Sequence, residues 1–298
     1  MSNRNRPPEI SPGQKAAPST DSIRVGRIRY INVDPIYFGL ENGLAPSWFK
    51  IIPAAPSTLN RMVAEAELDI SPVSSGAYVH HTGPRDPDPW LILPDLSISC
   101  HGPVMSVLLA SRYPIEELDG RKVILTDESG TAVLLLKLIF AIKGIQPQMR
   151  TGSIGGISPF DDDPDAVLVI GDSALTGGWN QKYRYLIDLG EVWFALSGLP
   201  IVFAVWVVRK TFADAHESRV ARVIDLFRQS QKEGQANLDR IITTGTGKLN
   251  LPGDQVNAYF QAMEYDLDEK KRQALKTFFN GLYTYKLIEH EAPLLFFG

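Results

Sequence analysis

The sequence predicts an α/β protein of two domains, with a cleft for a small ligand between them. Strand-like and helix-like segments alternate as far as Arg209, which is typical of proteins with largely parallel sheets. Residues 166–170 are entirely apolar, as expected of a parallel strand that is buried on both faces. Two long apolar strands, 104–111 and 201–208, enclose a segment that is a complete α/β unit by itself.

The two long strands define the predicted domains. Residues 23–109 and 201–298 form one discontinuous domain, and residues 110–200 form a second domain inserted into it. The two strands would act as the hinge, and pockets are common at such domain interfaces. Residues 1–22 are polar and carry several prolines, so we expect a disordered tail there.

Composition and charge argue against several classes of function. A net charge of −4 does not suit a general nucleic-acid-binding protein. The single cysteine, Cys100, cannot form an internal disulfide or a cysteine-rich zinc site. No apolar run approaches the ~18 residues of a membrane span. The N-terminal residues lack the apolar core of a signal peptide, so we expect a cytoplasmic protein.

The first strand and the first helix meet at Asn32. Residues 23–31 are rich in β-branched and aromatic types, which indicates a strand. Asp34 can cap the following helix, and Pro35 suits its first turn. Asn32 therefore lies outside the carboxyl end of a strand, where ligands bind in open α/β sheets. The adjacent helix N-terminus suits an anion, whereas a simple turn role for Asn32 is the alternative.

A second strand–turn–helix junction contains Ser74 and Ser75. The two serines follow a short buried strand, 68–70, and precede a helical segment, 77–81. Either hydroxyl can cap that helix, and capping alone is one interpretation. The other is that the serines face the cleft, because the junction repeats the geometry predicted at Asn32.

The third and fourth junctions complete the set of polar strand ends. Strand 122–126 leads through Ser129, Gly130 and Thr131 into a predicted helix over 130–143. Their backbone N–H groups and hydroxyls would cradle a carboxylate or phosphate, although the Gly-Lys-Ser/Thr of a nucleotide-binding loop is absent. Strand 165–171 leads into Asp172, a general acid–base group or a helix cap.

The remaining elements follow from hydrophobic periodicity. After Arg209 the chain is mainly helical, and no internal repeat is evident. The other predicted strands span residues 91–93, 96–100 and 185–189, and the other helices span 56–66, 191–196, 214–234, 235–244, 254–263 and 268–283.

Other polar residues near the predicted cleft are mostly neutral. Ser99 and Ser106 suit recognition of carboxylates and hydroxyls. His101 is a candidate base or ligand donor, and a structural role is the alternative. His80 and His81 are adjacent and cannot chelate a metal at the usual helical spacing, so we expect no metal site. Tyr30 could line the floor of the cleft.

Six stretches of the sequence point to a known family. The first, 26–37, reads Gly-Arg-Ile-Arg-Tyr-Ile-Asn-Val-Asp-Pro-Ile-Tyr, and the others lie at 69–75, 97–107, 125–131, 165–172 and 198–206. Together they resemble the chorismate dehydratases of the futalosine route to menaquinone. The sister family, which makes a dihydroxynaphthoate, usually opens with a Ser-Pro-Cys-Pro-Asn-Asp-like motif, and that motif is absent here.

The resemblance implies a fold like that of the type II periplasmic binding proteins, used here by an enzyme. It puts Asn32 at the active-site asparagine of the family and implies chorismate as the substrate, without metal or cofactor. Two departures stand out: the family often has Ser-Asp where this chain has Cys100 and His101, and Ser where it has Ala132. The first departure puts a shared role for position 101 in doubt, and the second removes a hydroxyl from the cradle.

The implied reaction removes water from C3–H and C4–OH of chorismate, which makes the ring aromatic. Ser74, Ser75, Ser129, Gly130 and Thr131 would anchor the carboxylates. Asn32 does not titrate and cannot be the base, so the enolpyruvyl carboxylate of the substrate would take the proton, with His101 as the rival base. Two alternatives are a non-catalytic binding protein for small anionic solutes and the sister dihydroxynaphthoate synthase. The sequence gives no oligomeric state.

Overall fold

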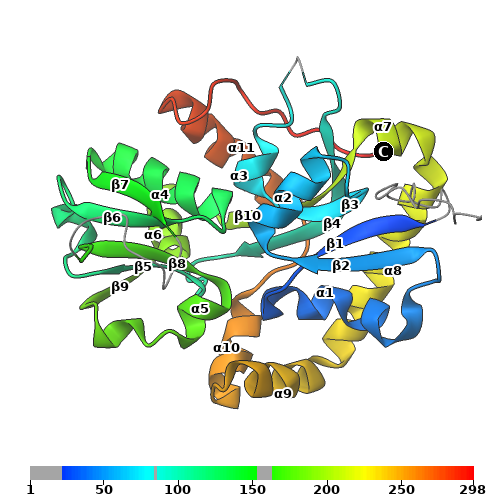
Figure 1. Ribbon diagram of the computed structural model, residues 1–298, viewed down its shortest axis with the longest axis horizontal. Coiled ribbons are helices and arrows are strands. Elements are labelled where there is room, and N and C mark those ends of the chain that lie inside the picture. The colour runs from blue at the N-terminus through cyan, green and yellow to red at the C-terminus, as the bar shows by residue number, and fades with distance from the viewer. Residues whose placement is uncertain (1–21, 84–85, 153–162) are drawn as a thin grey trace, which may run out of the picture.

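The computed structural model describes residues 22–83, 86–152 and 163–298, and it arranges them as two α/β lobes side by side (Figure 1). Each lobe is built on a sheet of five strands. The predicted fold class is therefore confirmed. The tail predicted over residues 1–22 lies outside the described residues, except for Ser22.

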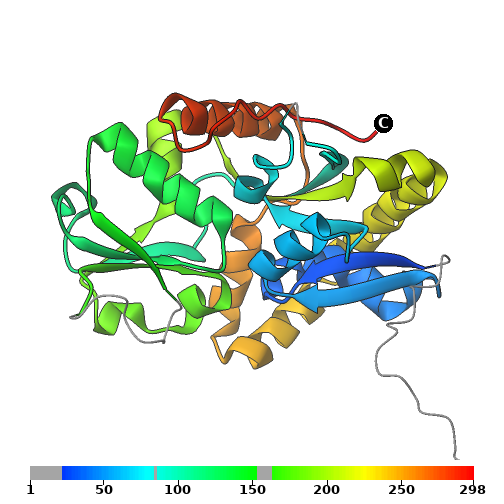
Figure 2. The same ribbon diagram turned by 45° about the horizontal axis from the view of Figure 1, so that its top comes forward.

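The first lobe is built on a sheet in the order β2-β1-β3-β10-β4. Strand β1 is parallel to β2 and β3, whereas β10 is antiparallel to both β3 and β4. The middle of β10 is fully buried, because helices cover both faces of this sheet (Figures 1 and 2). The strands are β1 (Ile23–Ile28), β2 (Phe49–Ala54), β3 (Ile70–Ser74), β4 (Trp90–Cys100) and β10 (Ile201–Arg209).

The second lobe is built on a sheet in the order β7-β6-β8-β5-β9. Strand β8 is the apolar run predicted to be buried; it lies between β6, to which it is parallel, and β5, to which it is antiparallel. The strands are β5 (Val107–Ser111), β6 (Lys122–Thr126), β7 (Gln148–Gly152), β8 (Ala166–Ile170) and β9 (Tyr185–Asp188).

Helices cover the sheets, and α11 lies against β10 of the first lobe and α4 of the second (Figure 2). A 3₁₀ turn, Ile31–Val33, precedes α1, and Leu40–Leu44 forms a π turn after it. Two further 3₁₀ turns span Ile115–Glu117 and Trp179–Gln181. The helices are α1 (Asp34–Gly39), α2 (Pro56–Ala64), α3 (Ser75–Tyr78), α4 (Gly130–Lys143), α5 (Gly171–Thr176), α6 (Leu189–Ser197), α7 (Lys210–Ala215), α8 (Glu217–Ala236), α9 (Leu238–Leu249), α10 (Gly253–Ala262) and α11 (Glu269–Thr284).

The chain crosses between the lobes at residues 101–106 and returns at 198–200. The outward crossing is fixed by Asp188, whose carboxylate accepts hydrogen bonds from the backbone N–H groups of Val104 (3.0 Å) and Met105 (2.6 Å). The strand predicted from residue 104 begins only at Val107, and all of β5 pairs within the second sheet. The proposed boundaries of the two domains stay a prediction. The boundary between residues 109 and 110 would fall inside β5.

Several strands differ from the prediction, among them β3, which spans Ile70–Ser74 and not 68–70. β2 and β7 were not predicted; both are edge strands, β2 contains Pro53, and β7 is largely exposed. The segments predicted as two strands, 91–93 and 96–100, are one strand, β4. Asp95 has a left-handed backbone there (φ 62°), and the pairing with β10 shifts register at the same place. Pro94 and Asp95, which separate the two predicted strands, therefore form a bulge within one strand.

Candidate functional site

A pocket lies between the two lobes, and Asn32 lines it. Its walls come from strand ends of the first lobe, from the crossing segment and from the starts of α4 and α5 in the second lobe. Apolar side chains such as Ile98, Phe203 and Met263 form most of the lining. The polar side chains that line the pocket are Tyr30, Asn32, Ser74, Ser106 and Ser129.

Asn32 contributes an unpaired polar atom to this pocket. It lies in the 3₁₀ turn between β1 and α1, which agrees with the predicted strand–helix junction. Its Oδ1 is buried and has no hydrogen-bond partner among the described residues. Leaving a buried carbonyl unsatisfied costs about 1–3 kcal/mol, so a ligand group that pairs with it gains that energy. The amide offers both an acceptor and a donor.

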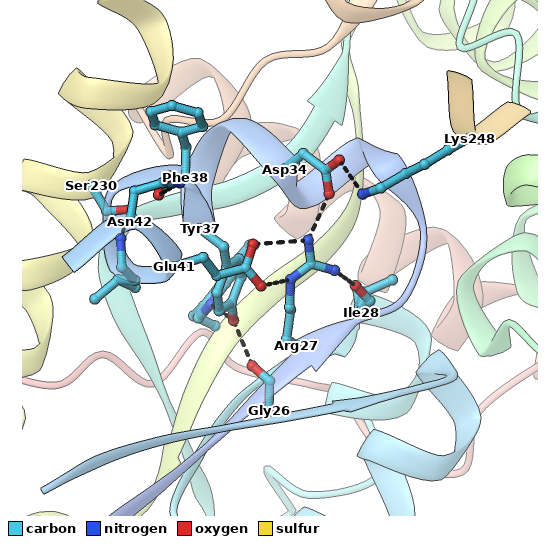
Figure 3. A network of polar contacts seen from close by, with 12 residues as sticks. Gly26, Arg27, Ile28, Asp34, Tyr37, Phe38, Glu41, Asn42, Ser230 and Lys248 are labelled. Atoms are coloured by element: carbon cyan, nitrogen blue, oxygen red, sulfur yellow. Dashed lines mark hydrogen bonds and ion pairs between the residues drawn. The ribbon is translucent and has the colours of Figure 1, made fainter. Parts of the chain in front are cut away.

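A partly buried ionic network holds the segment that follows Asn32 (Figure 3). Asp34 was predicted to cap α1, but it lies in the first turn and makes no cap. Its carboxylate instead pairs with the Arg27 guanidinium (2.6 Å) and with Lys248 Nζ from α9 (3.1 Å). Arg27 also pairs with Glu41 and donates to the carbonyl of Ile28 (2.8 Å), so α1 is fastened to β1.

Two capped helix starts meet at the opposite side of the pocket. The Ser74 hydroxyl accepts the backbone N–H of Ala77 at the start of α3 (3.0 Å), and Ser129 accepts that of Ala132 at the start of α4 (3.2 Å). A Cβ on Gly76 would lie 2.7 Å from the carbonyl of Gly130, so the two helix starts are in contact. In these contacts both hydroxyls act as acceptors, so each keeps a proton to donate to an anionic ligand.

Three other predicted residues are buried and do not line the pocket. Ser75 and Thr131 are fully buried, and their hydroxyls donate to the carbonyls of Val202 and Phe203 (2.7 Å each). Ser99 is also buried, and its hydroxyl donates to the carbonyl of Glu264 (3.1 Å). Substrate binding by these hydroxyls stays a prediction, and the geometry does not support it.

His101 is exposed and does not line the pocket. Its Nδ1 lies 3.3 Å from Lys270 Nζ, and its ring contacts Phe194, with 4.6 Å between the ring centroids. The predicted role as a catalytic base is not supported by this position, because the base must reach the substrate directly or through one water.

Asp172 lies at the start of α5, beside the pocket, and accepts the backbone N–H of Ile31 from the other lobe (3.3 Å). It does not cap its own helix, which was one of the two predicted roles. Burial raises the pKa of Asp172 to about 6; the hydrogen bond from Ile31 opposes this shift, and the carboxylate of Asp34 adds to it.

Tyr30 and Tyr259 support the pocket in ways that local sequence patterns do not reveal. The Tyr30 hydroxyl donates to Glu128 of the second lobe (2.8 Å), and its ring lies against Gly171, where a Cβ would come within 2.8 Å of it. The hydroxyl of Tyr259, from α10, donates to that of Ser106 (3.1 Å). Residues far apart in the sequence make these contacts.

Within the ranges described, no helix is long and apolar enough to cross a membrane. The same residues contain no group of three or more histidine, cysteine, aspartate or glutamate side chains placed to hold a metal ion. The cytoplasmic location stays a prediction.

The two lobes and the pocket between them define a protein of the periplasmic-binding-protein fold, and solved structures agree. A protein from Archaeoglobus fulgidus is 21% identical with a TM-score of 0.71, covering 91% of this chain and 100% of its own. A Candida albicans protein described as having the generic periplasmic binding protein fold is 13% identical with a TM-score of 0.65, covering 90% and 91%. The periplasmic aliphatic sulphonate binding protein of Escherichia coli is 13% identical with a TM-score of 0.63, covering 93% and 91%.

The chain belongs to the menaquinone biosynthesis family, whose model matches residues 23–284. The chorismate dehydratase of Thermus thermophilus is 29% identical over 280 residues, covering 87% of this chain and 94% of the relative. The 1,4-dihydroxy-6-naphtoate synthase of Streptomyces coelicolor is 26% identical, covering 93% and 97%. The family predicted from the sequence motifs is therefore confirmed.

Proposed function

We propose that this protein is a chorismate dehydratase, a lyase that converts chorismate to 3-enolpyruvoyloxybenzoate and water. The observation that carries the proposal is the buried, unpaired Oδ1 of Asn32 in the pocket between the lobes. The motif that contains Asn32 resembles the active-site motif of chorismate dehydratases. The relative from Thermus thermophilus, which is aligned over most of both chains, adds support.

The chemistry of the pocket suits chorismate, which carries two carboxylates, a ring hydroxyl and an apolar ring. Ser74 and Ser129 have hydroxyl protons to donate to a carboxylate. The start of α4 adds the partial positive charge of a helix N-terminus. The apolar walls at Ile98 and Phe203 suit the faces of the ring.

In the proposed reaction, chorismate loses the proton on C3 and the hydroxyl on C4. The electron pair of the broken C3–H bond becomes part of the aromatic ring, and hydroxide leaves C4. The group that accepts the C3 proton then passes it to this hydroxide, which departs as water. Nδ2 of Asn32 would donate to the leaving hydroxyl, and Oδ1 would accept a hydrogen bond from the substrate. Fixed donors of this kind stabilise charge as it develops.

The proton on C3 would pass to the enolpyruvyl carboxylate of the substrate itself. No histidine, aspartate, glutamate or lysine occurs among the described residues that line the pocket. Tyr30 is a poor base, because burial and the neighbouring Glu128 raise its pKa. Correct orientation alone can supply roughly 7–11 kcal/mol of a barrier for an internal transfer of this kind. The main role of the protein would then be to hold chorismate in a single conformer.

The relative from Streptomyces coelicolor makes the sister reaction the second candidate. A substrate larger than chorismate would need a wider cleft. A solved structure with a similar fold is that of a binding protein, so a non-catalytic binding protein is the third candidate. Binding and turnover of chorismate, measured together, separate all three.

The test is chorismate consumption by the purified protein without added metal or cofactor. The expected product is lighter than chorismate by one water and has a benzoate-like ultraviolet spectrum. Binding without turnover would contradict the proposal and favour a binding protein. No binding at all would also contradict it and would favour the sister reaction.

A further inference from the structure

The two residues immediately before Asn32 are held by the second lobe. The hydroxyl of Tyr30 donates to Glu128, just before α4, and the backbone N–H of Ile31 donates to Asp172, at the start of α5. The two carboxylates thus reach across the cleft to consecutive residues of the first lobe. The donor–acceptor distances are 2.8 Å and 3.3 Å.

The contact with Asp172 supplies a cap that the turn lacks. The residue before the 3₁₀ turn, Tyr30, makes no side-chain cap to it. The first N–H groups of any helical turn have no partner within that turn and need an outside acceptor. Asp172 provides this acceptor for Ile31, and it does so instead of capping α5, to which it belongs.

The residues after Asn32 are held by the first lobe. Asp34 is bound by Arg27 and Lys248, both from elements of that lobe (Figure 3). Asn32 therefore lies between a segment tied to one lobe and a segment tied to the other. If the lobes separate, the bonds to Tyr30 and Ile31 break while the bonds to Asp34 remain.

We propose that Asp172 is a positioning residue for Asn32: by accepting the Ile31 N–H from the second lobe, it fixes the turn that carries the Asn32 amide. This inference rests on the proposed function, since it assigns Asn32 a part in the reaction. Asp172 acts through Ile31 and not by touching the substrate. A misplacement of about 1 Å in a reacting group lowers a rate by about 10²-fold, so a loosened turn would be visible in kcat.

The test compares Asp172→Ala, Asp172→Asn and the control Ser173→Ala, the neighbouring residue on α5, which is exposed. Asp172→Ala removes the acceptor, whereas Asp172→Asn keeps a carbonyl oxygen at the same position. We expect Asp172→Ala to lower kcat by about tenfold to 10²-fold with a smaller change in KM. Asp172→Asn should recover most of this loss, and Ser173→Ala should leave kcat unchanged.

A second measurement needs no turnover. Amide hydrogen exchange of the peptide that contains Ile31 should be faster in Asp172→Ala than in the parent protein, and slow again in Asp172→Asn, since the N–H loses and regains its acceptor. Unchanged exchange at Ile31, or a kcat for Asp172→Ala within about twofold of the parent, would overturn the inference. If exchange follows the expected pattern but the parent does not consume chorismate, the cap is supported and the proposed function fails.

Discussion

The hydroxyl oxygens of Ser75 and Thr131 lie 3.1 Å apart, one on α3 of the first lobe and the other on α4 of the second. Each hydroxyl has a single proton, and each proton goes to a backbone carbonyl of β10. The two hydroxyls therefore do not donate to each other; they join both lobes to the same strand. Thr131 also accepts the backbone N–H of Gly76 (2.9 Å), which completes the junction.

Replacing Thr131 with valine should destabilise the protein. The change keeps the shape of the side chain but leaves the N–H of Gly76 and the carbonyl of Phe203 without their partner. A buried group that loses its hydrogen bond costs about 1–3 kcal/mol. We expect Thr131→Val to lower the free energy of unfolding by at least about 2 kcal/mol, measured by chemical denaturation.

Thr131→Ser is the matched control, because it keeps the hydroxyl and removes only a methyl group. It should lose less stability than Thr131→Val. Equal losses in the two variants would mean that packing, and not the hydrogen bonds, gives Thr131 its role.

The contact between the two helix starts predicts a strict requirement for glycine at position 76. A Cβ there would lie 2.7 Å from backbone atoms of Gly130 and Thr131, which are not flexible side-chain ends. We expect Gly76→Ala to push α3 and α4 apart and to cost about 1–3 kcal/mol of stability. Gly247→Ala on α9 is the control, because a Cβ there meets nothing within 4 Å and alanine favours helix. The measurement is thermal unfolding, and equal midpoints for the two variants would contradict the idea.

Local patterns were enough to predict the position of Asn32 and a serine cap at the second junction, but not that Ser74, and not Ser75, provides it. These features depend on the order of strand, turn and helix along the chain, which hydrophobic periodicity reveals. The direction of a side chain depends on what packs against it. Ser75 is adjacent to Ser74, yet its hydroxyl points to β10, which lies 127 residues further along the chain. Sequence spacing could not distinguish the two serines.

The crossing between the lobes also depends on distant contacts. Residues 104–111 look like one strand, but Asp188 holds the N–H groups of Val104 and Met105, so strand pairing starts only at Val107. Met105 has a left-handed backbone there (φ 64°), which ends any extended run. The composition of residues 104–111 gives no information about the position of the Asp188 carboxylate.

His101→Gln should leave turnover within about twofold of the parent, because the side chain is exposed and outside the pocket. The assay is chorismate consumption across a range of pH. A large loss of kcat would restore His101 as a base and contradict the substrate-assisted mechanism.

Asn32→Ala should lower kcat by about 10²–10³-fold, because in the proposed mechanism it removes a fixed hydrogen-bonding group at the reacting atoms. The fold should survive, since the Asn32 side-chain oxygen makes no bond within the described residues. Asn257→Ala, on the exposed surface of α10, is the matched control and should keep full activity. Kinetics and thermal unfolding of both variants are the measurements, and an active Asn32→Ala variant would remove Asn32 from the mechanism.

The pKa of Asp172 predicts a dependence of stability on pH. Burial raises this pKa from its ordinary value of 3.8 to about 6, while Asp34 adds to the shift and Lys248 and Arg27 oppose it. Between about pH 4 and pH 6 the unfolded chain loses this proton before the folded protein does, so the contribution of Asp172 to stability falls as pH rises through that window. Asp172→Asn cannot ionise, so it should be more stable than the parent at pH 7.5, and the difference should shrink at pH 4. Thermal unfolding of the two proteins at both pH values tests this, and a difference that grows toward pH 4 would show that the folded-state pKa is lowered instead.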